Sequence, residues 1–165
     1  MEEKSKKIAL GGVLLAIEAI ILALINIVPT NTLFLMGIAS LISSVIIREF
    51  GDKMGVLFTI ASVLISFVII ADKIQWILFA SSFALYGSVK GLIERKRSML
   101  AEWIMKLVFA NIVFAFLYMF TSAVTGININ IFVLVPGYNV AFVVYDVVYS
   151  QFIDLYNKKL KKCIK

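Results

Sequence analysis

The sequence predicts an all-α integral membrane protein, a bundle of six transmembrane helices. Of its 165 residues, 62% are hydrophobic and only 16% are charged, whereas a soluble domain carries about 45–50% apolar and about 25% charged residues. The mean hydropathy is +1.01. The apolar residues also form continuous runs, whereas a membrane β-barrel would show alternating segments of about ten residues. The three observations together favour helices that lipid surrounds.

Six segments are long enough, or nearly so, to cross a bilayer. A hydrocarbon core of about 30 Å requires about 20 mostly apolar residues in a helix. Taken as one domain over residues 1–165, the chain offers such segments at 8–28, 33–47, 53–71, 74–93, 99–122 and 136–156. The second is short unless it extends back to Thr30. The last begins at Pro136, which we expect in the first helical turn, where its missing N–H costs nothing.

The basic residues predict the orientation of the chain. The chain has 16 Lys and Arg residues, and all of them but Lys73, Lys90 and Lys106 lie in the two termini or in the connectors after the second and fourth segments. Because basic residues concentrate in cytoplasmic loops, both termini are predicted to be cytoplasmic. The net charge of +6 then reflects topology and attraction to the lipid bilayer, so no nucleic acid partner is expected.

Composition also argues against several kinds of catalysis. The chain has no His and a single cysteine, Cys163, which excludes His/Cys zinc sites, Ser-His-Asp and Cys-His catalysis, and haem held by His. Its sequence contains no Gly-x-x-x-x-Gly-Lys-[Ser/Thr] phosphate-binding motif. The acidic residues Glu18, Glu102 and Asp146 are too scattered in sequence to nominate a catalytic pair. We therefore expect a protein that is not an enzyme, with no metal site and no cofactor.

Ionisable side chains inside the predicted spans point to the interior of the bundle. Each costs about 2.5–3.5 kcal/mol on insertion scales and normally faces other helices. Glu18 lies near the middle of the first segment, and Glu102 and Lys106 are expected to neutralise each other as an i, i+4 pair. Asp146 lies about 15 Å beyond Pro136 along the helix. It must be protonated, hydrogen-bonded, or paired with another helix or with a ligand.

One face of the first segment carries small residues at helical spacing. The run consists of Ala9, Gly12, Ala16, Ala19, Ala23 and Asn26, spaced 3, 4, 3, 4 and 3. Small residues let helix backbones approach closely in lipid. The sequence leaves open whether Gly12, Ala16, Ala19 and Ala23 contact a partner protein or another helix of the same bundle.

Polar and aromatic residues near the uncharged outer side suggest a binding site for a small solute. Ligand pockets combine apolar walls with a few polar groups, and the candidates are Tyr138, Asn139, Phe142, Asp146, Gln75, Asn128 and Asn130. The connector 121–135 is uncharged and long enough to close over such a site. The alternative for the aromatic face of the last segment, which runs from Tyr138 to Tyr156, is core packing.

Several stretches resemble the substrate-binding S components of energy-coupling factor transporters. They are residues 8–29 (IALGGVLLAIEAIILALINIVP), the turn at 48–55 (REFGDKMG), the start of the last helix at 136–139 (PGYN) and its end at 156–162 (YNKKLKK). The resemblance implies a six-span subunit of the bacterial cell membrane that captures a vitamin or micronutrient from outside. It also implies docking, through the Ala-rich face of the first helix, on a transmembrane T component powered by partner ATPases. The alternative is a scaffold protein of an envelope complex that binds no solute.

Overall fold

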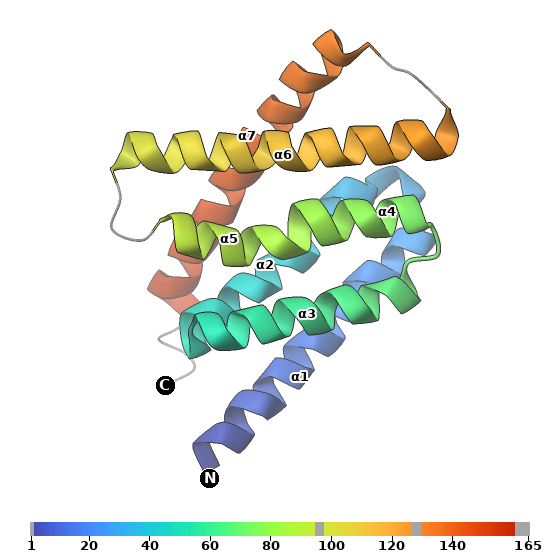
Figure 1. The fold of residues 1–165 in the computed structure, drawn as a ribbon. Coiled ribbons are helices and arrows are strands. Elements are labelled where there is room, and N and C mark those ends of the chain that lie inside the picture. The colour runs from blue at the N-terminus through green and yellow to red at the C-terminus, as the bar shows by residue number, and fades with distance from the viewer. Residues whose placement is uncertain (1, 95–97, 127–129, 161–165) are drawn as a thin grey trace. The chain divides into compact units, whose positions relative to one another are not determined.

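The computed structural model describes residues 2–94, 98–126 and 130–160, and in these ranges it consists of helices and short connectors without strands (Figure 1). Within these ranges, six helices are long and apolar enough to cross a membrane: Ser5–Asn26, Pro29–Phe50, Asp52–Ile69, Lys73–Ile93, Met99–Thr125 and Ile131–Lys158. The predicted fold class is therefore confirmed, and the chain is a multi-pass membrane protein. It divides into two compact units, Met1–Gly91 and Leu92–Lys165, which are described separately.

Unit 1 contains the first four spans. Its elements are α1 (Glu2–Ala23), η1 (Leu24–Asn26), η2 (Pro29–Asn31), α2 (Thr32–Phe50), α3 (Asp52–Ile69), α4 (Lys73–Leu78), the π-helical turn η3 (Phe79–Ala84) and α5 (Leu85–Ile93), whose last two residues belong to unit 2. Helices α1, α2 and α3 pack against one another pairwise. The second span, with η2 and α2, is longer than the range 33–47 predicted from the sequence, because η2 extends it back to Pro29 and α2 continues to Phe50.

Glycines at the turn between α2 and α3 allow these two helices to approach closely. Gly51 has a φ of 80°, a conformation that residues with a side chain rarely adopt. One turn later, a methyl group on Gly55 would collide with the side chain of Ile47. The REFGDKMG stretch therefore forms a tight helix–helix turn.

At the opposite end of these helices, Asn26 joins two connectors of unit 1. Its side-chain amide donates to the carbonyl of Ile69 over 2.9 Å, and its side-chain oxygen accepts from the amide of Ala71 over 3.1 Å. Lys73 donates to the carbonyls of Phe67 and Ile70 over 2.7 and 3.1 Å. A cation at the carboxyl end of α3 also complements its helix dipole. The α1–α2 and α3–α4 connectors thus lie at the same end of the unit.

Unit 2 contains the last two spans, α6 (Met99–Thr125) and α7 (Ile131–Leu155), with η4 (Tyr156–Leu160) continuing α7. Helix α6 ends at Gly126, which has a φ of 68° and donates its N–H to the carbonyl of Ser122 over 2.9 Å. Such a left-handed glycine is a common helix terminator. Asn130 caps α7 by accepting from the N–H of Phe132 over 3.0 Å.

The helix ends in unit 2 correct two expectations. Most of the segment 121–135 is helical, because α6 continues to Thr125 and α7 begins at Ile131. The prediction of a 15-residue connector that closes over the bundle is therefore wrong. Pro136 lies inside α7, beyond its first turn, so it removes a hydrogen bond that the helix would otherwise make.

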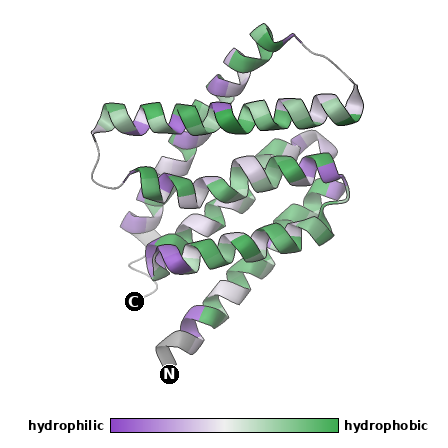
Figure 2. Cartoon of the chain, viewed as in Figure 1, coloured by the Kyte–Doolittle hydropathy of each residue, from purple (hydrophilic) through white to green (hydrophobic). Residues whose placement is uncertain are grey.

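The surface of the helices suits lipid. Large apolar side chains point outward along the spans, for example Ile8, Val68, Leu100 and Phe132, which are 69%, 81%, 78% and 84% exposed. Figure 2 shows apolar residues along most of each helix, with many of the hydrophilic residues near helix ends. One cluster of buried apolar residues in unit 1 consists of Leu22, Ile25, Met36, Ala39, Ile70, Phe79 and Ala84.

Candidate functional site

Four of the predicted ligand residues lie on α7 in unit 2. Tyr138 and Asn139 are half-buried, whereas Phe142 and Asp146 are buried. Their spacing of one, three and four residues places them along one side of the helix. What each of them contacts decides whether it is available to a solute.

Asn139 forms a reciprocal amide pair with Asn111 of α6. Each side-chain nitrogen donates to the other side-chain oxygen, over 3.1 and 3.2 Å. Each nitrogen also donates to a carbonyl of its own helix, from Asn111 to Leu107 and from Asn139 to Val135, both over 2.8 Å. Both N–H groups of each amide are therefore used. The pair joins α6 to α7, and each oxygen retains one lone pair that a solute donor can use.

The aromatic face of α7 is turned toward the protein. Tyr138 packs against Phe114 of α6 with ring centroids 5.1 Å apart, and Tyr145 packs edge-on against Tyr149 at 5.7 Å. Phe142, Tyr149 and Tyr156 are buried. These contacts correspond to the core-packing interpretation of the aromatic face.

Asp146 is ion-paired. The ammonium of Lys106 lies 3.0 Å from Oδ2 of Asp146 and 2.7 Å from Oε1 of Glu94. Lys106 and Asp146 are both buried, and the Lys106 ammonium also lies 5.5 Å from the ring centroid of Trp103. Of the alternatives that the sequence left open for Asp146, pairing with another helix is the one found. The sequence had assigned Lys106 to Glu102 instead, and the role of Glu94 was missed because it follows α5 and is distant in sequence.

The remaining predicted ligand residues are dispersed. Gln75 is half-buried in α4 of unit 1, so a common pocket with the residues of α7 stays a prediction. Asn130 is exposed and caps α7. Asn128 lies outside the described residues. None of these positions by itself defines a solute site.

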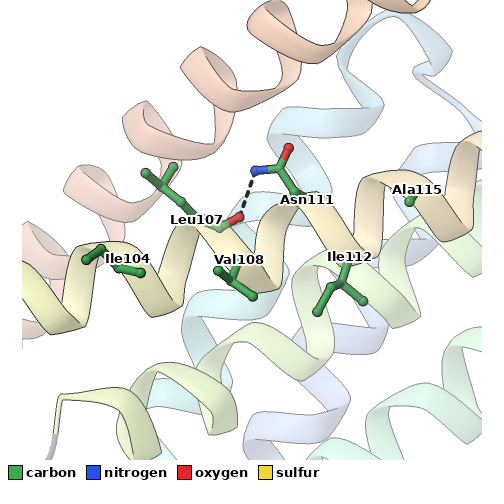
Figure 3. A pocket seen from close by; sticks show the side chains of 6 residues that line it. All are labelled: Ile104, Leu107, Val108, Asn111, Ile112 and Ala115. Atoms are coloured by element: carbon green, nitrogen blue, oxygen red, sulfur yellow. Dashed lines mark hydrogen bonds between the residues drawn. The ribbon is translucent and has the colours of Figure 1, made fainter.

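An open hollow runs along α6 (Figure 3). It is lined by Ile104, Leu107, Val108, Asn111, Ile112 and Ala115. Ile104, Val108 and Ile112 are each more than half exposed, and Figure 3 shows the amide of Asn111 directed at the carbonyl of Leu107. The hollow is open and is apolar apart from this amide.

The small-residue face of α1 divides into two parts. Ala19 and Ala23 are half-buried, whereas Gly12 and Ala16 are exposed. A methyl group built on Gly12 meets no heavy atom within 4 Å. Asn26, at the end of the same run, is engaged with the connector after α3. The part nearer the amino terminus is thus uncovered in the described structure, while the other part contributes to unit 1.

Glu18 is buried, as predicted, and contacts a hydroxyl group of α3. Its exposed fraction is 1%, and Ser62 of α3 donates to its Oε1 over 2.6 Å. The buried faces of α2 and α3 carry six hydroxyl side chains, which we call the hydroxyl cluster: Ser40, Ser43, Ser44, Thr59, Ser62 and Ser66. This cluster was not predicted from the sequence, although the three- and four-residue spacing of its members is a helical signal.

Comparisons of the chain with models of protein families, with curated proteins and with solved structures find no match.

Proposed function

We propose that the protein is a substrate-capturing subunit of a vitamin or micronutrient uptake transporter in a bacterial cell membrane. In this proposal it binds a small solute from the outer side and docks on a transmembrane T component. Partner ATPases supply the energy, as in the energy-coupling factor transporters whose S components the sequence resembles.

The observation that carries the proposal is the uncovered small-residue face of α1. Gly12 and Ala16 are exposed, and Gly12 has free space around it. Large apolar side chains such as Ile8, Val13 and Ile20 cover neighbouring parts of the same helix, with exposed fractions of 69%, 57% and 65%. Small residues in lipid favour close contact with another helix. A membrane-embedded partner that packs on this face is therefore the interaction that α1 suits best.

The solute would bind through α6 and α7. Asn139 and Asn111 each keep one oxygen lone pair, and the rings of Tyr138 and Phe114 form a second contact between the same two helices. An amide oxygen next to aromatic rings is typical of pockets that orient a flat, polar ligand. Gln75, Asn128 and Asn130 remain proposed contributors to the solute site.

A scaffold protein is the second candidate, and a specific observation favours it. The polar groups of unit 2 that the solute proposal needs are already engaged in helix–helix contacts, Asn139 with Asn111 and Asp146 with Lys106. Such interactions lock membrane helices together without any ligand. The two proposals therefore differ in what co-purifies with the protein and in what the α1 face binds.

The experiment that tests the proposal places bulky side chains on the uncovered small-residue face of α1. Gly12→Leu and Ala16→Leu are expected to leave folding intact, because both positions are exposed, and to abolish both co-purification of a membrane partner and solute uptake. Leu33→Ile, on an exposed position of α2, is the matched control. Native mass spectrometry of the purified chain is expected to show a small bound solute in both variants. Unchanged partner binding, or the consistent absence of a solute, contradicts the transporter proposal.

A further inference from the structure

The buried carboxylate of Glu18 has one oxygen without a protein partner. Oε1 accepts the hydrogen bond from Ser62, but Oε2 is fully buried and has no hydrogen-bond partner among the residues that the structure describes. Glu18 is eight residues before the end of the Ser5–Asn26 span, which places it about 12 Å from that end and near the middle of the membrane. Leaving a polar group unsatisfied at this depth is costly.

The hydroxyl groups on the buried faces of α2 and α3 mostly use their protons within their own helices. Ser40, Ser43, Ser44 and Ser66 donate their hydroxyl protons to carbonyls three residues earlier in their own helices, over 2.6, 2.7, 2.6 and 2.9 Å. Because the hydroxyl proton is used in each of these bonds, a hydroxyl of this kind can act toward a further group only as an acceptor. Ser62 connects Glu18 directly to this surface, since Thr59 and Ser66 lie one turn on either side of it on the buried face of α3.

We propose that Glu18 and the hydroxyl cluster form a binding site for one sodium ion. Oε2 of Glu18 would supply the anionic ligand, and hydroxyl oxygens of α3 and α2 would supply neutral ones. Oxygen ligands of this kind suit hard cations. A single carboxylate balances a single positive charge, whereas a divalent ion would leave net charge inside the membrane.

The site differs from the one proposed for the solute. It lies within the packing of α1, α2 and α3 in unit 1, and it does not depend on whether the chain captures a solute. Because the ion bridges α1 to α3, we expect it to stabilise the folded state and to make that stability depend on sodium concentration.

Thermal unfolding of the full chain in detergent tests the proposal. At equal ionic strength, sodium chloride is expected to raise the Tm above the values in potassium and choline chloride, with saturation as the concentration increases. Glu18→Gln keeps the shape of the side chain and is expected to abolish the sodium effect. Ser62→Ala is expected to shift saturation to higher sodium concentration. Glu102→Gln, which removes a half-buried carboxylate from α6, is the matched control and should keep the full effect.

Direct binding of radioactive sodium to the wild-type protein provides a second measurement, which is independent of whether Glu18→Gln folds. One ion per chain, displaced by excess unlabelled sodium but not by choline, supports the site. The proposal is overturned if the Tm responds to pH while the three salts act alike, because a proton then satisfies Glu18. Sodium binding that survives in Glu18→Gln overturns it as well.

Discussion

The ammonium of Lys106 lies 3.0 Å from a carboxylate oxygen of Asp146, and this pair joins α6 to α7 inside a predicted membrane span. The same ammonium reaches Glu94 over 2.7 Å. Lys106 thus connects the carboxylate of Glu94, which follows α5, to the carboxylate of Asp146 in the middle of α7. The stability of unit 2 is expected to depend on it.

Removing the cation should therefore destabilise the protein more than removing either carboxylate. Breaking a buried ion pair by deleting one partner costs about 3–5 kcal/mol, and Lys106→Met is expected to fall in that range. Asp146→Asn should cost less, because Glu94 still contacts the ammonium. The double variant Lys106→Met/Asp146→Leu should recover part of the loss. Thermal unfolding in detergent measures all three.

The control for this prediction is Glu102→Gln. The sequence alone predicts an i, i+4 pair between Glu102 and Lys106, whereas the structure directs Lys106 to Asp146 and Glu94. A small effect of Glu102→Gln agrees with the structure. A loss of stability as large as that of Lys106→Met would instead support the ion pair between Glu102 and Lys106 that the sequence predicts.

Hydropathy and charge were sufficient to predict the fold class, because span length and the distribution of basic residues are properties of the chain itself. The partner of Asp146 was not predictable. Its cation lies 40 residues away on another helix, and sequence spacing gives no information on which helices are neighbours. For the same reason Asn139 could be selected as a polar group in a span, but its pairing with Asn111 could not.

Helix ends were predicted less well than helix existence. The connector 121–135 contains no charge and reads as an exposed loop, but apolar residues from 131 to 135 continue α7 back beyond Pro136. Proline is tolerated in membrane helices where neighbouring groups compensate for its missing N–H. The local signal at Pro136 was therefore overridden by the length of apolar sequence around it.

The amide pair of Asn111 and Asn139 gives a second prediction. Either Asn111→Leu or Asn139→Leu removes the two reciprocal hydrogen bonds, and side-chain hydrogen bonds between membrane helices contribute about 0.6 kcal/mol on average and about 1.7 at most. Each single variant is expected to lower the unfolding free energy by about 0.6 to 1.7 kcal/mol. The double variant should lose less than the sum of the two. Additive losses would show that the amides do not interact.

The same two variants separate a structural role of Asn139 from a ligand role. If Asn139 only joins the helices, Asn111→Leu and Asn139→Leu should reduce solute retention equally. If Asn139 contacts the solute, as proposed above, Asn139→Leu should reduce retention more than Asn111→Leu does. Ligand retention measured by native mass spectrometry distinguishes these outcomes.

Gly55 and Gly91 provide a matched pair for testing how closely helices pack in unit 1. A methyl group on Gly55 would collide with the side chain of Ile47, whereas one on Gly91 would meet the same side chain at an ordinary contact distance of 3.8 Å. Overpacking of this kind costs about 1–3 kcal/mol. Gly55→Ala should therefore lower the Tm clearly, and Gly91→Ala should leave it nearly unchanged. Ile47→Ala added to Gly55→Ala should restore part of the loss.

The membrane orientation can be tested with cysteine accessibility. Hydrogen bonds from Asn26 to Ile69 and Ala71 place the α1–α2 and α3–α4 connectors at one end of unit 1, and the positive-inside rule assigns that end to the outside. In a Cys163→Ser background, Thr30→Cys and Ala71→Cys should both react with a membrane-impermeant maleimide in intact cells. In the protein without substitutions, Cys163 lies in the tail predicted to be cytoplasmic and should react only after the cells are opened. Labelling of Cys163 in intact cells, or of only one of the two connectors, would contradict this orientation and remove the outward-facing site with it.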